Sequence, residues 1–200
     1  MAVTATITIP ADGLRQLGNV ALFADTARDA NPLLRAVHLE STGAELVTVA
    51  TDRYTAARET IPLAVEPGDV FAATVDLDGV KAALKIRRGA SNLLPVTLTV
   101  NGESVTFDNG ESLVRAAIVD GAGGYPKVDQ FFTPAAPAEP QTLPVLFGAD
   151  PTFLARLGKI RTEVPKAGPA RITVVDPRKP ILVQVDDTFQ AVIMPVTVAP

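Results

Sequence analysis

The stretch LLRAVHLESTGAELVTVATDRYTAARETIPL, residues 33–63, contains three runs in which apolar and polar residues alternate. Alternation with a period of two is typical of strands that bury one face. It predicts strands at 35–40, 45–50 and 54–61, with Thr42 and Gly43 in a turn between the first two. We therefore expect an antiparallel sheet built from this stretch.

The same stretch is preceded by a strand and a short helix, and this order recurs along the chain. Residues 4–9 alternate, and Asp12 is placed to cap a helix whose apolar stripe is Leu14, Leu17, Val20 and Ala21. Asp12-Gly13-Leu14-Arg15 matches Asp78-Gly79-Val80-Lys81, where Asp78 is the expected cap of a second helix. Asp150 and Pro151 open a third helix, with apolar positions Phe153, Leu154, Leu157 and Ile160. The other predicted strands are 70–75, 95–100, 104–107, 112–119, 144–148, 170–175, 181–185 and 189–198.

These elements predict an α+β fold of three βαβββ repeats, with helices on one face and antiparallel sheets on the other. Residues 1–131 hold two repeats and form a complete domain, and 145–200 hold the third as a half domain. The segment between them, residues 132–144, reads FTPAAPAEPQTLP and is expected to be an extended linker. Asn101-Gly102 and Asn109-Gly110 predict hairpins in which both turn residues have positive φ.

The composition excludes several classes of protein. The chain has 200 residues, 47% of them hydrophobic and 20% charged, which is enough for a packed core. It has no cysteine, no export signal and no apolar run approaching about 18 residues, so we expect a cytoplasmic location and no membrane span. The net charge of -4 argues against a nucleic-acid partner unless basic residues gather on one face.

Basic residues do cluster in or just after the three helices, whereas acidic residues such as Glu40 and Glu59 are expected at strand edges and turns. One interpretation is a surface that faces the phosphates of duplex DNA without sequence preference. The other is that surface helices commonly carry Lys and Arg near their C-termini. The expected DNA-facing residues are Arg15, Lys81, Lys85, Arg87, Arg88, Arg156, Lys159 and Arg161.

No catalytic constellation is evident. His38 is the only histidine and lies in a predicted strand without a nucleophile beside it. Asp76 and Asp78 precede a helix, where capping explains them better than metal binding, and no lysine follows Gly121–Gly124 as a phosphate loop would require. We expect neither an enzyme nor a bound metal or cofactor.

Three segments carry a resemblance to the bacterial DNA sliding clamp, the β subunit of DNA polymerase III. They are residues 33–63, VDGAGGYPKVDQFF at 119–132 and DDTFQAVIMPV at 186–196. The resemblance implies a DNA-clamp fold and a hydrophobic groove that receives linear peptide motifs of polymerases and repair proteins. Carried over, the groove residues are Leu34, Thr51, Arg53, Tyr54, Thr55, Ala56, Pro126, Gln130, Phe131, Val192, Met194, Pro195 and Val196.

Two departures from the family accompany this resemblance. Family members commonly place an arginine where this chain has Thr55, so a basic groove residue is lost. The family's first domain and half of its third have no counterpart, which leaves the third repeat without a partner in its own chain and with an exposed sheet edge. We therefore expect a homo-oligomer in which two chains pair their third repeats about a two-fold axis, and four chains if a twelve-repeat ring forms.

The sequence thus predicts a processivity factor that holds duplex DNA and recruits polymerase or repair proteins through a groove, with a clamp loader as a further possible partner. The alternative is a clamp-like adaptor or decoy that forms no ring, binds clamp-binding peptides and regulates replication proteins.

Overall fold

The computed structural model describes residues 4–86, 94–120, 124–133, 147–162, 169–176 and 178–196. Within these ranges the predicted α+β class is correct, and the elements alternate much as the residue pattern indicated. In chain order they are β1 (Ala5–Ile9), α1 (Gly13–Ala21), β2 (Ala36–Ser41), β3 (Glu45–Thr51), β4 (Thr55–Pro62), β5 (Phe71–Asp76), α2 (Leu77–Ala83), β6 (Val96–Val100), β7 (Ser104–Asp108), β8 (Leu113–Ala117), the 3-10 turn η2 (Asp129–Phe131), α3 (Pro151–Leu157), β9 (Arg171–Thr173), β10 (Ile181–Gln184) and β11 (Phe189–Ile193).

The strands form two antiparallel sheets, one of four strands in the order β1-β6-β7-β8 and one of seven in the order β5-β2-β3-β4-β11-β10-β9. We call β1–β4 with α1 the first unit, β5–β8 with α2 the second, and α3 with β9–β11 the third. The first strand of each of the first two units pairs with the other unit, because β1 lies on β6 and β5 lies on β2. Residues 4–86 and 94–120 are therefore interlocked through both sheets.

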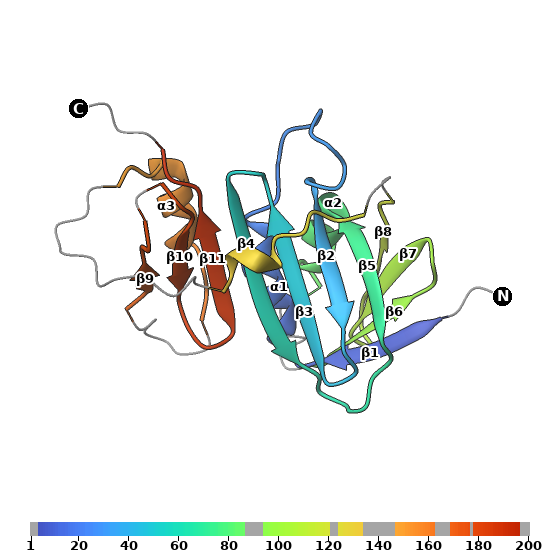
Figure 1. Ribbon diagram of the computed structural model, residues 1–200. Coiled ribbons are helices and arrows are strands. Elements are labelled where there is room, and N and C mark those ends of the chain that lie inside the picture. The colour runs from blue at the N-terminus through green and yellow to red at the C-terminus, as the bar shows by residue number, and fades with distance from the viewer. Residues whose placement is uncertain are drawn as a thin grey trace.

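Helices α1 and α2 cover one side of the seven-stranded sheet (Figure 1). Leu14, Leu17 and Val20 of α1 are fully buried, as are Val80 and Ala83 of α2. Burial of a leucine or valine side chain contributes about 1.5–3 kcal/mol, so the predicted apolar stripes anchor both helices. Helix α3 differs, because none of its residues is buried and Leu154 is 44% exposed.

The third unit joins the first through the sheet. β11 pairs with β4 from Phe189 opposite Glu59 to Ile193 opposite Thr55, and Figure 1 shows the two strands side by side. The expectation that this unit lacks any partner in its own chain is therefore wrong for one edge. The opposite edge is different, because among the described strands β9 pairs only with β10.

Two of the three expected helix caps need correction. The Asp12 side chain makes no capping hydrogen bond and instead accepts one from Arg15. Helix α2 begins earlier than predicted, so Asp76 caps it by accepting from the backbone N–H groups of Asp78 and Gly79. Asp150 does cap α3, through the N–H of Thr152, and Pro151 stands in the first turn as predicted.

The hairpin turns also differ from the prediction. Gly102 and Gly110 have positive φ, but Asn101 and Asn109 do not. The asparagine side chains instead accept hydrogen bonds from backbone N–H groups two and three residues on, as in Asn101 to Ser104 at 2.9 Å. Asn therefore acts here through its side-chain acceptor.

Some predicted features lie outside the described residues, namely Arg87, Arg88, most of the 121–124 segment, and the linker from 134 onward. The first strand expected in the third unit falls mostly there too, although Gly148 forms a bridge with Val196. No described helix has the length and apolar character needed to span a bilayer.

Candidate functional site

A cavity of about 400 Å³ opens where the first and third units meet. Its walls come from the turn between β3 and β4, the segment around η2, and the end of β11; in Figure 1 the yellow η2 lies over the sheet on the side opposite α1. The lining residues are Asn31, Leu34, Thr51, Arg53, Tyr54, Thr55, Ala56, Pro126, Lys127, Val128, Gln130, Phe131, Val192 and Met194. We call this cavity the seam groove.

All but two of the predicted groove residues line the seam groove. The exceptions are Pro195 and Val196, and the Val196 N–H instead donates to the carbonyl of Gly148 at 3.0 Å. Sequence reasoning missed Asn31, Lys127 and Val128. The last two lie inside the 119–132 segment that carried the resemblance, so the signal was present, whereas nothing local pointed to Asn31.

The tight turn that presents Tyr54 is held by one buried carboxylate. Asp52 accepts hydrogen bonds from the N–H groups of Tyr54 and Thr55 at 3.1 and 2.7 Å, and from the Thr55 hydroxyl at 2.9 Å. Arg53 lies at the apex with φ of 81°, a region that a residue with a Cβ rarely adopts. The Asp52 bonds therefore offset backbone strain and fix the direction of Tyr54.

Arg156 of α3 ties the same turn to the third unit. Its guanidinium donates to Asp52 at 2.6 Å and to the Thr55 hydroxyl at 2.8 Å, and it lies over the Phe153 ring at 5.1 Å. Phe153 in turn stacks with Tyr54 at 6.3 Å between centroids. The structure thus gives Arg156, one of the residues expected to face DNA, two internal partners in this turn.

The seam groove has an apolar floor and a partly cationic rim. A hydrophobic cluster that includes Ala56, Val128 and Val192 lies beneath it. Tyr54, Phe131 and Met194 are 62%, 39% and 38% exposed, which is unusual for large apolar side chains grouped around one cavity. Arg53 and Lys127 add positive charge. Such a surface suits a short segment with apolar side chains and a negative charge.

Solved structures with the same arrangement are bacterial DNA polymerase clamps. Over 96% of the chain, Caulobacter crescentus pol III beta matches with a TM-score of 0.80 at 18% identity. The DNA polymerase sliding clamp of Bacillus subtilis matches over 97% with a TM-score of 0.74 at 16% identity. A putative DNA polymerase III beta subunit of Eubacterium rectale matches over 96%, at 0.76 and 14%. The chain has the sliding-clamp fold.

The clamp fold is present only in part, since the chain spans 66%, 64% and 65% of the length of these three proteins, respectively. Neither a protein-family model nor a curated protein sequence matches the chain. At these identities the likeness shows the fold, and what the clamps do is not transferred with it.

Of the basic residues expected to face DNA on this clamp fold, Lys81, Lys85, Lys159 and Arg161 are exposed. Arg15 is not free for a phosphate, because it donates to the carbonyl of Thr162 at 3.0 Å and pairs with Asp12 at 3.4 Å. Arg15 thus fastens the segment after α3 to α1, a role that its place on a helix surface did not indicate.

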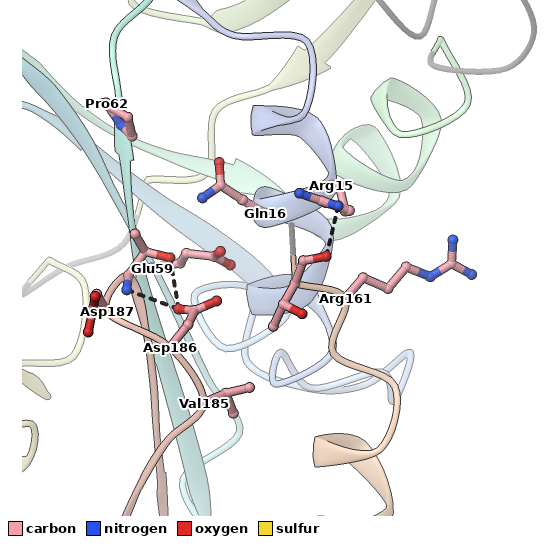
Figure 2. A pocket seen from close by; sticks show the side chains of 10 residues that line it. Arg15, Gln16, Glu59, Pro62, Arg161, Val185, Asp186 and Asp187 are labelled. Atoms are coloured by element: carbon pink, nitrogen blue, oxygen red, sulfur yellow. Dashed lines mark hydrogen bonds between the residues drawn. The ribbon is translucent and has the colours of Figure 1, made fainter. Parts of the chain in front are cut away.

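A second cavity, of about 270 Å³, lies between α1, β4 and the hairpin that joins β10 to β11 (Figure 2). Glu59 enters it from β4 and is 1% exposed, which corrects the expectation of a surface carboxylate. Burial raises the pKa of Glu59 to about 8, although hydrogen bonds from Asn19 and Gln16 oppose this shift. Asn19 donates to Glu59 at 3.2 Å and also holds both backbone polar groups of Arg161.

The residues weighed for catalysis have structural roles. His38 bonds the Thr74 hydroxyl at 3.0 Å and stacks on Tyr125 at 4.9 Å, and burial lowers the pKa of its ring. Asp76 accepts from the N–H groups of Asp78 and Gly79 at the start of α2. Among the described residues no group of three or more His, Cys, Asp or Glu side chains could hold a metal ion.

Proposed function

We propose that the chain is a clamp-like, non-catalytic processivity factor that captures short peptide motifs of DNA polymerases or repair proteins in the seam groove. The observation that carries the proposal is the grouping of Tyr54, Phe131 and Met194 around one cavity at the junction of two clamp-like units. A methionine and two aromatic rings around an apolar floor adapt to several related peptides.

Three copies of one βαβββ unit account best for the element order, with a complete domain at 1–131, a linker at 132–144 and a half domain at 145–200. Helices α1 and α2 would then face duplex DNA, with Lys81 and Lys85 on that side and Lys159 and Arg161 continuing it. A clamp loader and a ring of four chains belong to the same proposal, as does residence in the cytoplasm.

Titration of the chain with a peptide bearing the clamp-binding motif of a bacterial DNA polymerase tests the groove. Tyr54→Ala and Met194→Ala should each weaken binding by about 2 kcal/mol, roughly thirtyfold, because buried aromatic and apolar anchors dominate such interfaces. The matched control is Leu113→Ala, since Leu113 is 63% exposed on β8, outside the groove. Binding that survives both groove substitutions unchanged would contradict the proposal.

The second candidate is an adaptor or decoy that uses the same groove but encloses no DNA. The internal partners of Arg15 and Arg156 favour it, because they reduce the positive charge available to phosphates. The two functions differ in topology. A ring is retained on circular DNA and lost from linear DNA, whereas an adaptor shows no such difference.

A further inference from the structure

Helix α3 repeats the apolar pattern of α1, yet its apolar face is only partly covered: Phe153, Leu157 and Ile160 pack against the core, and Leu154 is left exposed. LRQLGNV at residues 14–20 corresponds to LARLGKI at 154–160. Leu14, Leu17 and Val20 are 0% exposed, whereas Leu154 is 44% exposed, and Leu157 and Ile160 are only partly buried. In residues 147–162, 169–176 and 178–180 no side chain reaches full burial. A face with the pattern of a core helix is therefore covered less completely in α3 than in α1.

The complete unit shows what that layer would be. VKAALKI at 80–86 in and after α2 follows the same pattern, with Leu84 at the place of Gly18. A Cβ added to Gly18 would lie 3.4 Å from the Leu84 side chain, so equivalent positions of α1 and α2 meet each other. Contact between equivalent positions is the property of a two-fold arrangement, and it makes such a face complementary to another copy of itself.

Gly158, the C-cap residue that follows α3, corresponds in the alignment to Gly18 of α1. A Cβ added there would meet only the carbonyl oxygen of Ala155, at 3.6 Å, which belongs to the same helix. Among the described residues, no atom of another element therefore lies within 4 Å of a Cβ added to Gly158. This is consistent with a helix that packs at Gly158 against a partner outside this chain.

The strand at the outer edge of the third unit, β9, also has one side without a described partner. In the seven-stranded sheet, β9 lies beside β10 as β2 lies beside β3. The outer edge of β2 pairs with β5, whereas β9 is the last described strand at its end of the sheet. β9 is three residues long, and Ile172 at its centre is 52% exposed. An open strand edge beside a half-exposed apolar helix is a surface on which a second such unit can place its own edge and helix.

We propose that α3 and the β9 edge form a self-association surface on which a second copy of this chain packs about a two-fold axis, α3 against α3, in the manner of α1 on α2. The inference rests on the assembly of several chains named in the proposed function and deepens it by assigning the contacting face, and its test needs neither peptide nor DNA. It differs from the pairing of β11 with β4, which joins neighbouring units edge to edge within one chain.

Sedimentation velocity of the whole chain tests the surface. The wild type should sediment as twice 20.9 kDa or as a multiple of that dimer. Leu154→Glu and Gly158→Gln should each raise the dissociation constant of the dimer at least about tenfold, because a charge or an added side chain would enter a close helix contact. Gly158 has φ of -68°, so glutamine fits the monomer without strain. Val70→Glu is the control, since Val70 is 73% exposed on a distant loop.

Cross-linking gives a second, independent measurement, because the chain has no cysteine. Under mild oxidation Leu154→Cys should form a disulfide-linked dimer, and Val70→Cys should not. Equal cross-linking of the two variants would overturn the proposal. So would a wild-type chain that stays at 20.9 kDa at all concentrations, which would mean that a different protein or a further clamp segment covers this face. The Leu154→Glu variant should still bind the peptide, because Leu154 does not line the seam groove. Its peptide titration therefore distinguishes failure of the self-association surface from failure of the groove.

Discussion

At the scale of single residues, Arg53 shows how the seam groove is held under strain. Its φ of 81° costs a residue with a side chain roughly 1–2 kcal/mol relative to glycine. Arg53→Gly should therefore raise the free energy of unfolding by about 0.5–1 kcal/mol, partly offset by the flexibility of glycine in the unfolded chain. Chemical denaturation measures this change. A loss of stability would mean that the guanidinium contributes more than the strain removes.

Glu59 gives the molecule a predicted pH dependence. Its carboxyl has an ordinary pKa of 4.5 when exposed and about 8 in the fold, so the folded state holds its proton longer than the unfolded state. The stability contributed by Glu59 is complete below about pH 4.5 and is lost as pH rises through about 8. Glu59→Gln, which cannot ionise, should remove this decline and be more stable than the wild type near pH 9 by a few kcal/mol. Unfolding curves that remain parallel across this range would contradict the assignment.

The same residue shows where prediction from sequence ends. Alternation places Glu59 correctly in a strand, and an isolated acid in a strand is ordinarily solvated. Its burial depends on α1, through Asn19 and Gln16, and on the third unit, whose Arg161 backbone bonds Asn19. These interactions join positions that are far apart in the sequence, so no local pattern could indicate them.

At the scale of elements, helices α1 and α3 offer a matched comparison. Leu14→Ala removes a fully buried side chain and should cost about 2–5 kcal/mol of stability. Leu154→Ala removes a side chain at the equivalent position that is 44% exposed, and in dilute protein it should cost less than about 1 kcal/mol. Thermal or urea denaturation at low protein concentration measures both. Equal losses would show that α3 is covered within its own chain.

The boundaries of the strands were largely predictable from the sequence, whereas the pairing of strands between units was not. Period-two alternation located every strand of the first unit to within about two residues, because each of these strands buries one face in the core. The pairing of β11 with β4 followed from no residue pattern, since an edge strand and an interior strand of a long sheet look alike in sequence. The resemblance of three segments to the sliding clamp located most of the seam groove. The ion pair between Arg156 and Asp52 was not predicted.

At the scale of the whole molecule, DNA binding should depend on charge near α2. Lys81→Glu combined with Lys85→Glu should weaken binding to duplex DNA and lower the steepness of its salt dependence by roughly one unit for each phosphate that is no longer neutralised. Arg178→Glu combined with Lys179→Glu changes the charge by the same amount on an exposed turn far from α2 and is the control. Equal effects of the two pairs would indicate a response to net charge alone.

The most direct test of the central claim, that the junction between the first and third units is a peptide-binding groove, is nuclear magnetic resonance of the isotope-labelled chain during titration with a clamp-binding peptide. We predict that the largest backbone shifts occur at Tyr54, Phe131 and Met194, on the three segments that build the seam groove. Shifts confined to α3 and β9, or an unchanged spectrum at saturating peptide, would contradict the account.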